Sequence, residues 1–153
     1  MNKLACGCPG SQVRTVEKAP ESTTAQPGRL ASELRQWPTQ LHLVPPHAPW
    51  LQNAHLLIAA DCTPFAYAEF HRDFIKGRVL VNACPKLDET SNYVAKLTEM
   101  LTQNDIQSVT VTIMEVPCCR GMAIMAEQAV KASGKDIPLH IAVIGVNGER
   151  INR

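Results

Sequence analysis

The sequence lacks the features that mark membrane, secreted and nucleic-acid-binding proteins. No apolar run is long enough to cross a bilayer, and no apolar stretch of the secretory type follows Met1. The 15 Lys and Arg residues nearly balance the 14 Asp and Glu residues, so the charge gives no reason to expect nucleic acid as a partner. We therefore expect a cytoplasmic protein with no membrane span.

Common nucleotide-binding and hydrolase motifs are also missing. The chain contains no G-x-G-x-x-G, no G-x-x-x-x-G-K and no G-x-S-x-G, which excludes the usual dinucleotide fingerprint, P-loop and nucleophile elbow. Candidate functional residues must therefore come from another part of the sequence, and one group of residues has an unusual arrangement. These are the 6 cysteines, 2 of which stand side by side in the stretch VPCCRG.

The chain divides into an N-terminal arm and one larger domain. Residues 1–30 contain ACGCPG followed by VEKAPESTTAQPGR, which is rich in Pro, Ser, Thr and Glu and poor in large apolar residues. Such a composition buries too little surface to offset the entropy lost on ordering, so we expect a cysteine-containing arm and linker. Residues 31–153 are long enough for one domain with a sizeable core.

Short apolar runs that suit β-strands recur in the larger domain. They are QLHLV (40–44), HLLIAAD (55–61), RVLVNA (78–83), SVTVTIMEV (108–116) and LHIAVIGV (139–146). Most of these runs are apolar at successive positions, which is typical of strands that are covered on both faces, as in a parallel sheet.

Two amphipathic segments between the later runs have helical spacing. In the first, residues 90–104, the apolar face consists of Val94, Leu97 and Leu101. In the second, residues 119–135, it consists of Met122, Met125, Ala129 and Val130, and Gly134 provides a C-terminal stop. The alternation of strands and helices predicts an α/β fold, a flavodoxin-like or Rossmann-like doubly wound sheet of four to five mainly parallel strands.

Four cysteines directly follow three of the predicted strands. Cys62 comes after the run 55–61, Cys84 comes after the run 78–83, and Cys118 and Cys119 come after the run 108–116. Since the carboxyl ends of parallel strands meet at one edge of a sheet, where open α/β folds bind their ligands, we expect these thiols to gather there. Clustered cysteines in a reducing compartment more often bind metal or perform redox chemistry than form disulfides.

The surroundings of these thiols favour a metal cluster. Prolines adjoin or follow them closely and would stiffen the loops. Cys118 and Cys119 stand where a helix is expected to begin, so the helix dipole, free amides and Arg120 would favour thiolates. Four thiolates are the ligand set of a [4Fe–4S] cluster. We therefore predict such a cluster on Cys62, Cys84, Cys118 and Cys119, acting in electron transfer or redox sensing.

Zinc is the alternative occupant of this site. Cys₄ or Cys₃His sites satisfy zinc, and His71 in FAYAEFHRD is a candidate fourth ligand. A zinc or other mononuclear site with an open position would allow hydrolytic or lyase chemistry, with Asp61, His71 or Glu115 handling protons. Asp61, Glu115 and Asp88 lie beside the cysteines in sequence and could accept hydrogen bonds around the metal ligands, as Arg120 could donate them. The three acids could equally be helix caps or ion-pair partners.

The arm carries the two remaining cysteines, Cys6 and Cys8. A C-x-C pair can chelate a metal, cap the same cluster, or remain as free thiols in a loose terminus. It can also exchange disulfides, so a metal-free thiol redox protein, in which this pair reacts with Cys118 or Cys119, is a further alternative.

The segments AADCTPFAY, CPKLD and MEVPCC carry a resemblance as well. With the chain around them, from ACGCPGS to the end, they resemble a family of bacterial and archaeal iron–sulfur cluster-binding, ferredoxin-like proteins. The similarity corresponds to the α/β domain of that family, without the N-terminal ferredoxin module that members often carry. It implies an iron–sulfur cluster and a redox partner protein, such as a ferredoxin or an oxidoreductase. The oligomeric state stays open, and a homo-oligomer is allowed.

A second resemblance concerns architecture alone. The small cluster-bearing subunit of respiratory NADH:quinone oxidoreductase has a flavodoxin-like sheet and a cluster held partly by two adjacent cysteines. The pair Cys118 and Cys119 is similar to that tandem pair, whereas the other motifs of that subunit are missing from this sequence. The likeness is therefore an analogy of arrangement.

Overall fold

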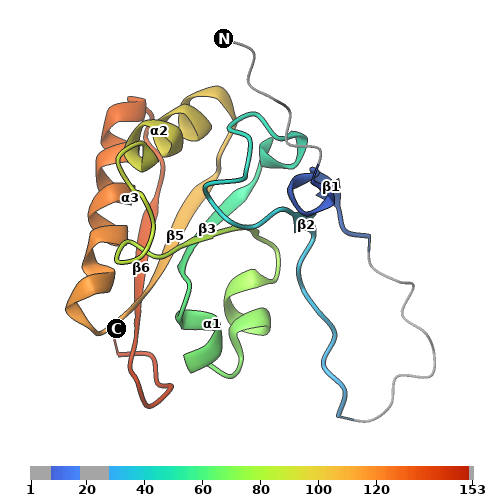
Figure 1. The fold of residues 1–153 in the computed structure, drawn as a ribbon, viewed down its shortest axis with the longest axis vertical. Helices are drawn as coiled ribbons and strands as arrows, with labels where there is room; N and C mark the ends of the chain where they lie inside the picture. Colours follow the sequence, from blue (N-terminus) through green and yellow to red (C-terminus); the bar gives the residue numbers. More distant parts are fainter. Residues whose placement is uncertain (1–7, 18–27, 152–153) are drawn as a thin grey trace.

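Four parallel strands form the centre of the structure, a computed structural model that describes residues 8–17 and 28–151. They are β3 (His55–Ala60), β4 (Val79–Ala83), β5 (Ser108–Met114) and β6 (Leu139–Ile144), and their order across the sheet is β4-β3-β5-β6 (Figure 1). This is the doubly wound α/β organisation that the sequence predicts. The strand order reverses between β3 and β5, which makes the gap beyond their carboxyl ends the topological switch point.

The central strands are buried along nearly their whole length. Every residue of β3 after His55 and every residue of β5 after Ser108 is buried. Leu56 pairs with Val109 and Ile58 with Val111, so large aliphatic side chains share one face of the sheet. The uninterrupted apolar runs in the sequence thus reflect a sheet that is covered on both sides.

Helices α2 (Tyr93–Gln103) and α3 (Arg120–Ser133) lie side by side against the sheet (Figure 1). They connect β4 to β5 and β5 to β6, and right-handed crossovers in the same direction place both helices on one face. The apolar face of α3 is shifted from the predicted one, because Ala123 and Ala126 are buried while Met125 and Val130 are only half-buried. In the described part of the chain, no helix is long and apolar enough to span a membrane.

The connection from β3 to β4 runs in the opposite direction across the sheet and therefore belongs to the other face. It begins with the short helix α1 (Thr63–Ala66) and continues through a π-helical turn at His71–Ile75. Phe70, Phe74 and Ile75 are its buried apolar residues. This connection places Cys62 at the start of a compact turn, directly after the central strand.

The predicted strand at residues 40–44 is not formed. Only Gln40 makes an isolated parallel bridge, to Asn82 of β4, and the chain then turns ahead of Pro45 and Pro46. Leu41 and Val44 are nevertheless fully buried. The apolar character of this run therefore reflects core packing, and the described residues contribute four strands to the sheet.

The described part of the N-terminal arm lies against the larger domain. Its strand β1 (Arg14–Thr15) pairs antiparallel with β2 (Gln36–Trp37), and the Trp37 indole donates a 2.7 Å hydrogen bond to the Gly10 carbonyl. Gln36 is fully buried and its amide donates to the Leu80 carbonyl of β4 at 2.6 Å. Residues 8–17 therefore form a surface-hugging arm next to the outer strand, while Cys6 lies outside the described residues.

Candidate functional site

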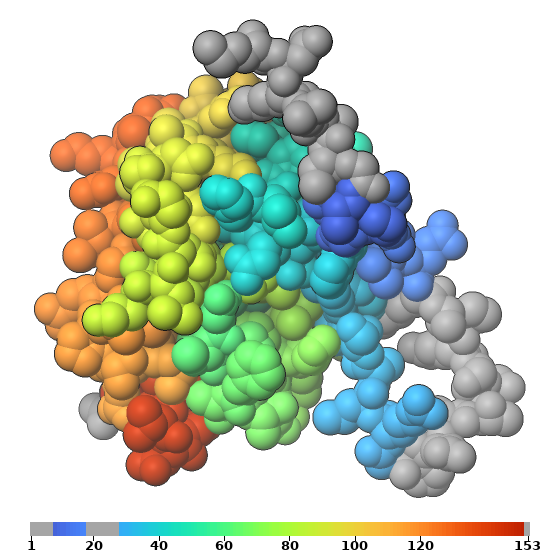
Figure 2. Space-filling model, in the orientation of Figure 1, coloured from blue at the N-terminus to red at the C-terminus, as the bar shows by residue number. Residues whose placement is uncertain are grey.

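Four cysteines lie just beyond the carboxyl ends of three neighbouring strands, as the sequence predicts. Cys62 precedes α1 after β3, Cys84 directly follows β4, and Cys118 and Cys119 form part of a 3₁₀ turn between β5 and α3. Figure 2 shows the lime-coloured chain after β4 next to the green chain after β3. Cys62 and Cys118 are exposed, Cys84 is partly exposed, and Cys119 is 6% exposed.

The thiols that follow β3 and β5 are close neighbours at the switch point. Burial raises the pKa of Cys119, and the adjacent thiols of Cys118 and Cys62 raise the same pKa further, against an opposing backbone hydrogen bond at Met114. The thiols of Cys118 and Cys62 thus lie close enough to Cys119 to act on its charge, so the loops after β3 and β5 approach each other.

The expectation that the helix start favours a thiolate at Cys119 is wrong for the metal-free chain. The Cys119 amide donates to the Val116 carbonyl at 3.1 Å, and the Arg120 amide donates to the Pro117 carbonyl. These amides are already engaged and cannot stabilise a thiolate, whereas burial penalises the charge. Burial therefore favours the protonated thiol of Cys119 in the metal-free chain.

Asp88 fixes the loop that carries Cys84. One oxygen of its carboxylate accepts hydrogen bonds from the Cys84 amide at 3.0 Å and from the Tyr93 hydroxyl at 2.8 Å. Tyr93 is fully buried, and burial followed by the bond to Asp88 raises its pKa. The suggestion that Asp88 caps a helix is wrong, because α2 begins after Asn92 and has no side-chain cap.

The Cys84 loop also contacts the first turn of α3. A Cβ atom added to Gly121 would lie 3.4 Å from the Pro85 Cβ, which is an ordinary van der Waals contact. Pro85 and Gly121 flank Cys84 and the pair Cys118–Cys119 in sequence, so this packing brings the two cysteine loops together. Sequence reasoning missed Gly121, since nothing in the helical pattern marks it as a contact point.

Buried threonines support the turn at Cys62. The Thr63 hydroxyl lies 2.8 Å from the Ala60 carbonyl and 2.9 Å from the hydroxyl of Thr112 on β5. Both threonines are fully buried, so they join the ends of the two central strands beneath the site. A polar residue inside a buried strand, as at Thr112, is the sequence signal that could have revealed this pair.

The acidic residues beside the cysteines link strand ends. Asp61 accepts a 2.7 Å hydrogen bond from the Asn82 amide of β4, and Glu115 accepts a 2.9 Å bond from the Val146 amide after β6. Both carboxylates therefore accept hydrogen bonds that hold neighbouring segments of the chain together. The predicted alternative in which they handle protons stays a prediction.

His71 and Cys8 do not follow any of the three strand ends that carry the other cysteines. The Nδ1 atom of His71 accepts a 3.1 Å hydrogen bond from the Glu33 amide, which ties the chain before β2 to the π-helical turn. Cys8 is exposed and precedes β1, which lies well away from α1 in Figure 1. Across residues 8–17 and 28–151, no three His, Cys, Asp or Glu side chains are already arranged to hold a single metal ion.

Comparison with known proteins identifies the fold and leaves the chemistry open. Residues 48–153 match the family described as Rossmann-like domain. An uncharacterized protein of Archaeoglobus fulgidus is 30% identical over 116 residues, covering 76% of this chain and 81% of the relative. No solved structure matches. Neither description mentions a cofactor, so the resemblance to iron–sulfur proteins stays a prediction.

Proposed function

The chain belongs to the Rossmann-like domain family, and we propose that it holds a [4Fe–4S] cluster at the ligand-binding edge of this fold. The ligands are Cys62, Cys84, Cys118 and Cys119. The observation that supports the proposal is that four thiols lie just beyond the carboxyl ends of the three neighbouring strands β4, β3 and β5. The role that follows is electron transfer or redox sensing with a redox partner protein, in a reducing cytoplasmic setting.

The donor set fits this cofactor. Four cysteine thiolates are the usual ligands of a [4Fe–4S] cluster, which supplies a reversible one-electron centre when bound. Cys62 and Cys118 are exposed, so this side of the site is open to a partner, while Cys119 lies in apolar surroundings. The burial that keeps Cys119 protonated is compensated when a metal takes the place of its proton.

The loops are also braced in a way that suits a ligand site. Asp88 fixes the Cys84 amide, the Thr63–Thr112 pair fixes the turn at Cys62, and the Pro85–Gly121 contact sets the spacing between two loops. Side chains that orient ligands in this way are a regular part of metal sites.

Metal analysis of anaerobically prepared protein tests the proposal. Reconstitution with iron and sulfide is expected to give a brown protein with about four iron and four sulfide per chain, bleached by a strong reductant. A parallel sample loaded with zinc serves as the colourless comparison. Stoichiometric zinc without visible absorbance would contradict the proposal and favour the zinc alternative. A metal-free protein that loses thiols under mild oxidant would favour the thiol redox alternative.

Alkylation of the metal-free protein should show which thiols react fastest. Cys119 is expected to react with iodoacetamide about tenfold more slowly than Cys118, because a raised pKa leaves less thiolate at a given pH and burial limits access. Mass spectrometry of peptides after timed quenching at pH 8 measures both rates. In denaturant the difference should vanish, and equal rates in the folded protein would contradict the burial of Cys119.

The contact between Gly121 and Pro85 gives another prediction. Gly121→Leu should displace the Cys84 loop from α3 and lower the iron retained after reconstitution by more than half, because the side chain must pass Pro85. Gly121→Ala is the matched control. Its Cβ fits at 3.4 Å, so it should retain the cluster and stabilise the helix by up to about 1 kcal/mol. Equal retention in both variants would contradict the role of this contact.

A further inference from the structure

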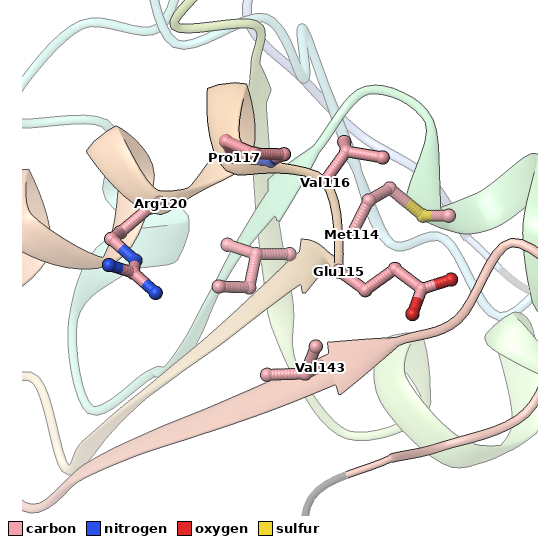
Figure 3. A pocket seen from close by; sticks show the side chains of 7 residues that line it. Met114, Glu115, Val116, Pro117, Arg120 and Val143 are labelled. Atoms are coloured by element: carbon pink, nitrogen blue, oxygen red, sulfur yellow. The ribbon is translucent and has the colours of Figure 1, made fainter.

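A pocket of about 370 Å³ lies beside the Cys118–Cys119 turn (Figure 3). It is formed by the ends of β5 and β6 and by the first turn of α3. Its volume falls at the lower end of the range for small-ligand sites. The pocket shares Pro117 with the turn that carries the cysteines, so an occupant would lie next to the proposed cluster.

The floor of the pocket is apolar. Ile113 of β5 and Val143 of β6 are partners in the parallel register, so their side chains lie together on one face of the sheet. The helix over this face buries mainly alanines toward the sheet, and β6 is the last strand in the order. Val143 is half-buried beneath these small side chains, and its carbonyl accepts the Ile151 amide from the chain after β6.

The two charged residues of the pocket stand on opposite sides of it. Figure 3 shows the Arg120 guanidinium on one side and the Glu115 carboxylate on the other. One Glu115 oxygen already accepts the Val146 amide, whereas the Arg120 side chain makes no hydrogen bond or ion pair with another described residue.

We propose that this pocket binds a small organic monoanion with an apolar body. The carboxylate pairs with Arg120, since a guanidinium matches the geometry of a carboxylate, and the body lies on Ile113 and Val143. The ligand carries a single negative charge because a second carboxylate would approach Glu115. This inference assigns the pocket a substrate class and does not depend on which metal the cysteines hold.

Titration with hexanoate tests the proposal on the full chain, both metal-free and after reconstitution. Hexanoate should bind saturably, at least tenfold more tightly than hexan-1-ol or the dianion adipate. Arg120→Gln should weaken hexanoate at least tenfold and leave hexan-1-ol within about twofold. Lys131→Gln removes an exposed cation from the last turn of the same helix and should change neither affinity. Calorimetry and amide chemical shifts provide the readouts.

Several outcomes would overturn the proposal. They are hexanoate binding that does not saturate, hexan-1-ol binding as tight as hexanoate binding, or an unchanged hexanoate affinity in Arg120→Gln. Val143→Phe fills the floor and should weaken hexanoate and hexan-1-ol alike, with circular dichroism checking its fold. Binding is measured with and without metal, so the two proposals can fail independently. If the chain binds hexanoate but takes up no iron, the ligand pocket is supported and the iron–sulfur cluster is refuted.

Discussion

Changing Cys119 to serine should remove at least nine-tenths of the iron and sulfide that the wild-type protein retains after reconstitution. The loss follows because a serine hydroxyl is a poor substitute for a thiolate and Cys119 supplies the most buried of the four sulfurs. Cys62→Ser, Cys84→Ser and Cys118→Ser should each cause a loss in the same direction. Iron and sulfide analysis, together with visible absorbance, measures retention per folded chain.

Cys8→Ser is the matched control for this series. Cys8 is exposed and precedes β1, and it follows none of the sheet strands that end in the four cysteines, so its substitution should leave iron and sulfide content unchanged. A loss in Cys8→Ser would show that the arm contributes a ligand. Full retention in two or more of the strand-end variants would contradict a four-cysteine cluster. If only Cys118→Ser retained its iron and sulfide, Cys119 would be a cluster ligand and Cys118 would be a free thiol.

The general position of this site could be predicted from the sequence. Apolar runs at 55–61, 78–83 and 108–116 fix three strands, and the fold places their carboxyl ends at one edge. A cysteine after each of these runs must then lie at that edge, whatever the details of packing. Chain order and strand direction suffice for this inference, because a parallel sheet converts sequence position into spatial position.

The bracing of the site could not be predicted in the same way. Asp88 has the sequence context of a helix cap, yet its carboxylate bonds to the Cys84 amide and the Tyr93 hydroxyl. The contact between Pro85 and Gly121 joins two loops that lie 36 positions apart in the sequence. Both features depend on how α2 and α3 pack over the sheet, which local periodicity does not specify.

The electrostatic expectation failed for a related reason. A position at the start of a helix suggests free amides and a favourable dipole, and sequence reasoning assigned Cys119 a stabilised thiolate on this basis. In the structure, a 3₁₀ turn precedes α3 and uses the Cys119 amide, while the side chain is buried. Burial and local hydrogen bonding, which decide the direction of the pKa shift, are three-dimensional properties.

Asp88→Ala should destabilise the metal-free protein by about 3 kcal/mol, the largest effect that we expect outside the cysteines. The substitution leaves the fully buried Tyr93 hydroxyl without its acceptor and releases the Cys84 amide. Each lost partner carries a desolvation cost, and hydrogen bonds to a charged acceptor contribute more than neutral ones. Urea unfolding followed by circular dichroism gives the free energy, and iron retention should fall because the Cys84 loop is no longer fixed.

Three further variants separate the effect of the Asp88 hydrogen bonds from the effect of removing a negative charge. Tyr93→Phe removes only the hydroxyl and should cost about 1 kcal/mol, while Asp88→Asn keeps an acceptor and should fall between wild type and Asp88→Ala. Glu89→Ala removes a neighbouring exposed carboxylate that accepts the Ser91 amide and should change stability by less than about 0.5 kcal/mol. If Asp88→Ala matched Glu89→Ala in stability and in iron retention, the shared carboxylate would have no special role. The Cys84 loop would then owe its position to its backbone hydrogen bonds and to the packing of Pro85 against Gly121.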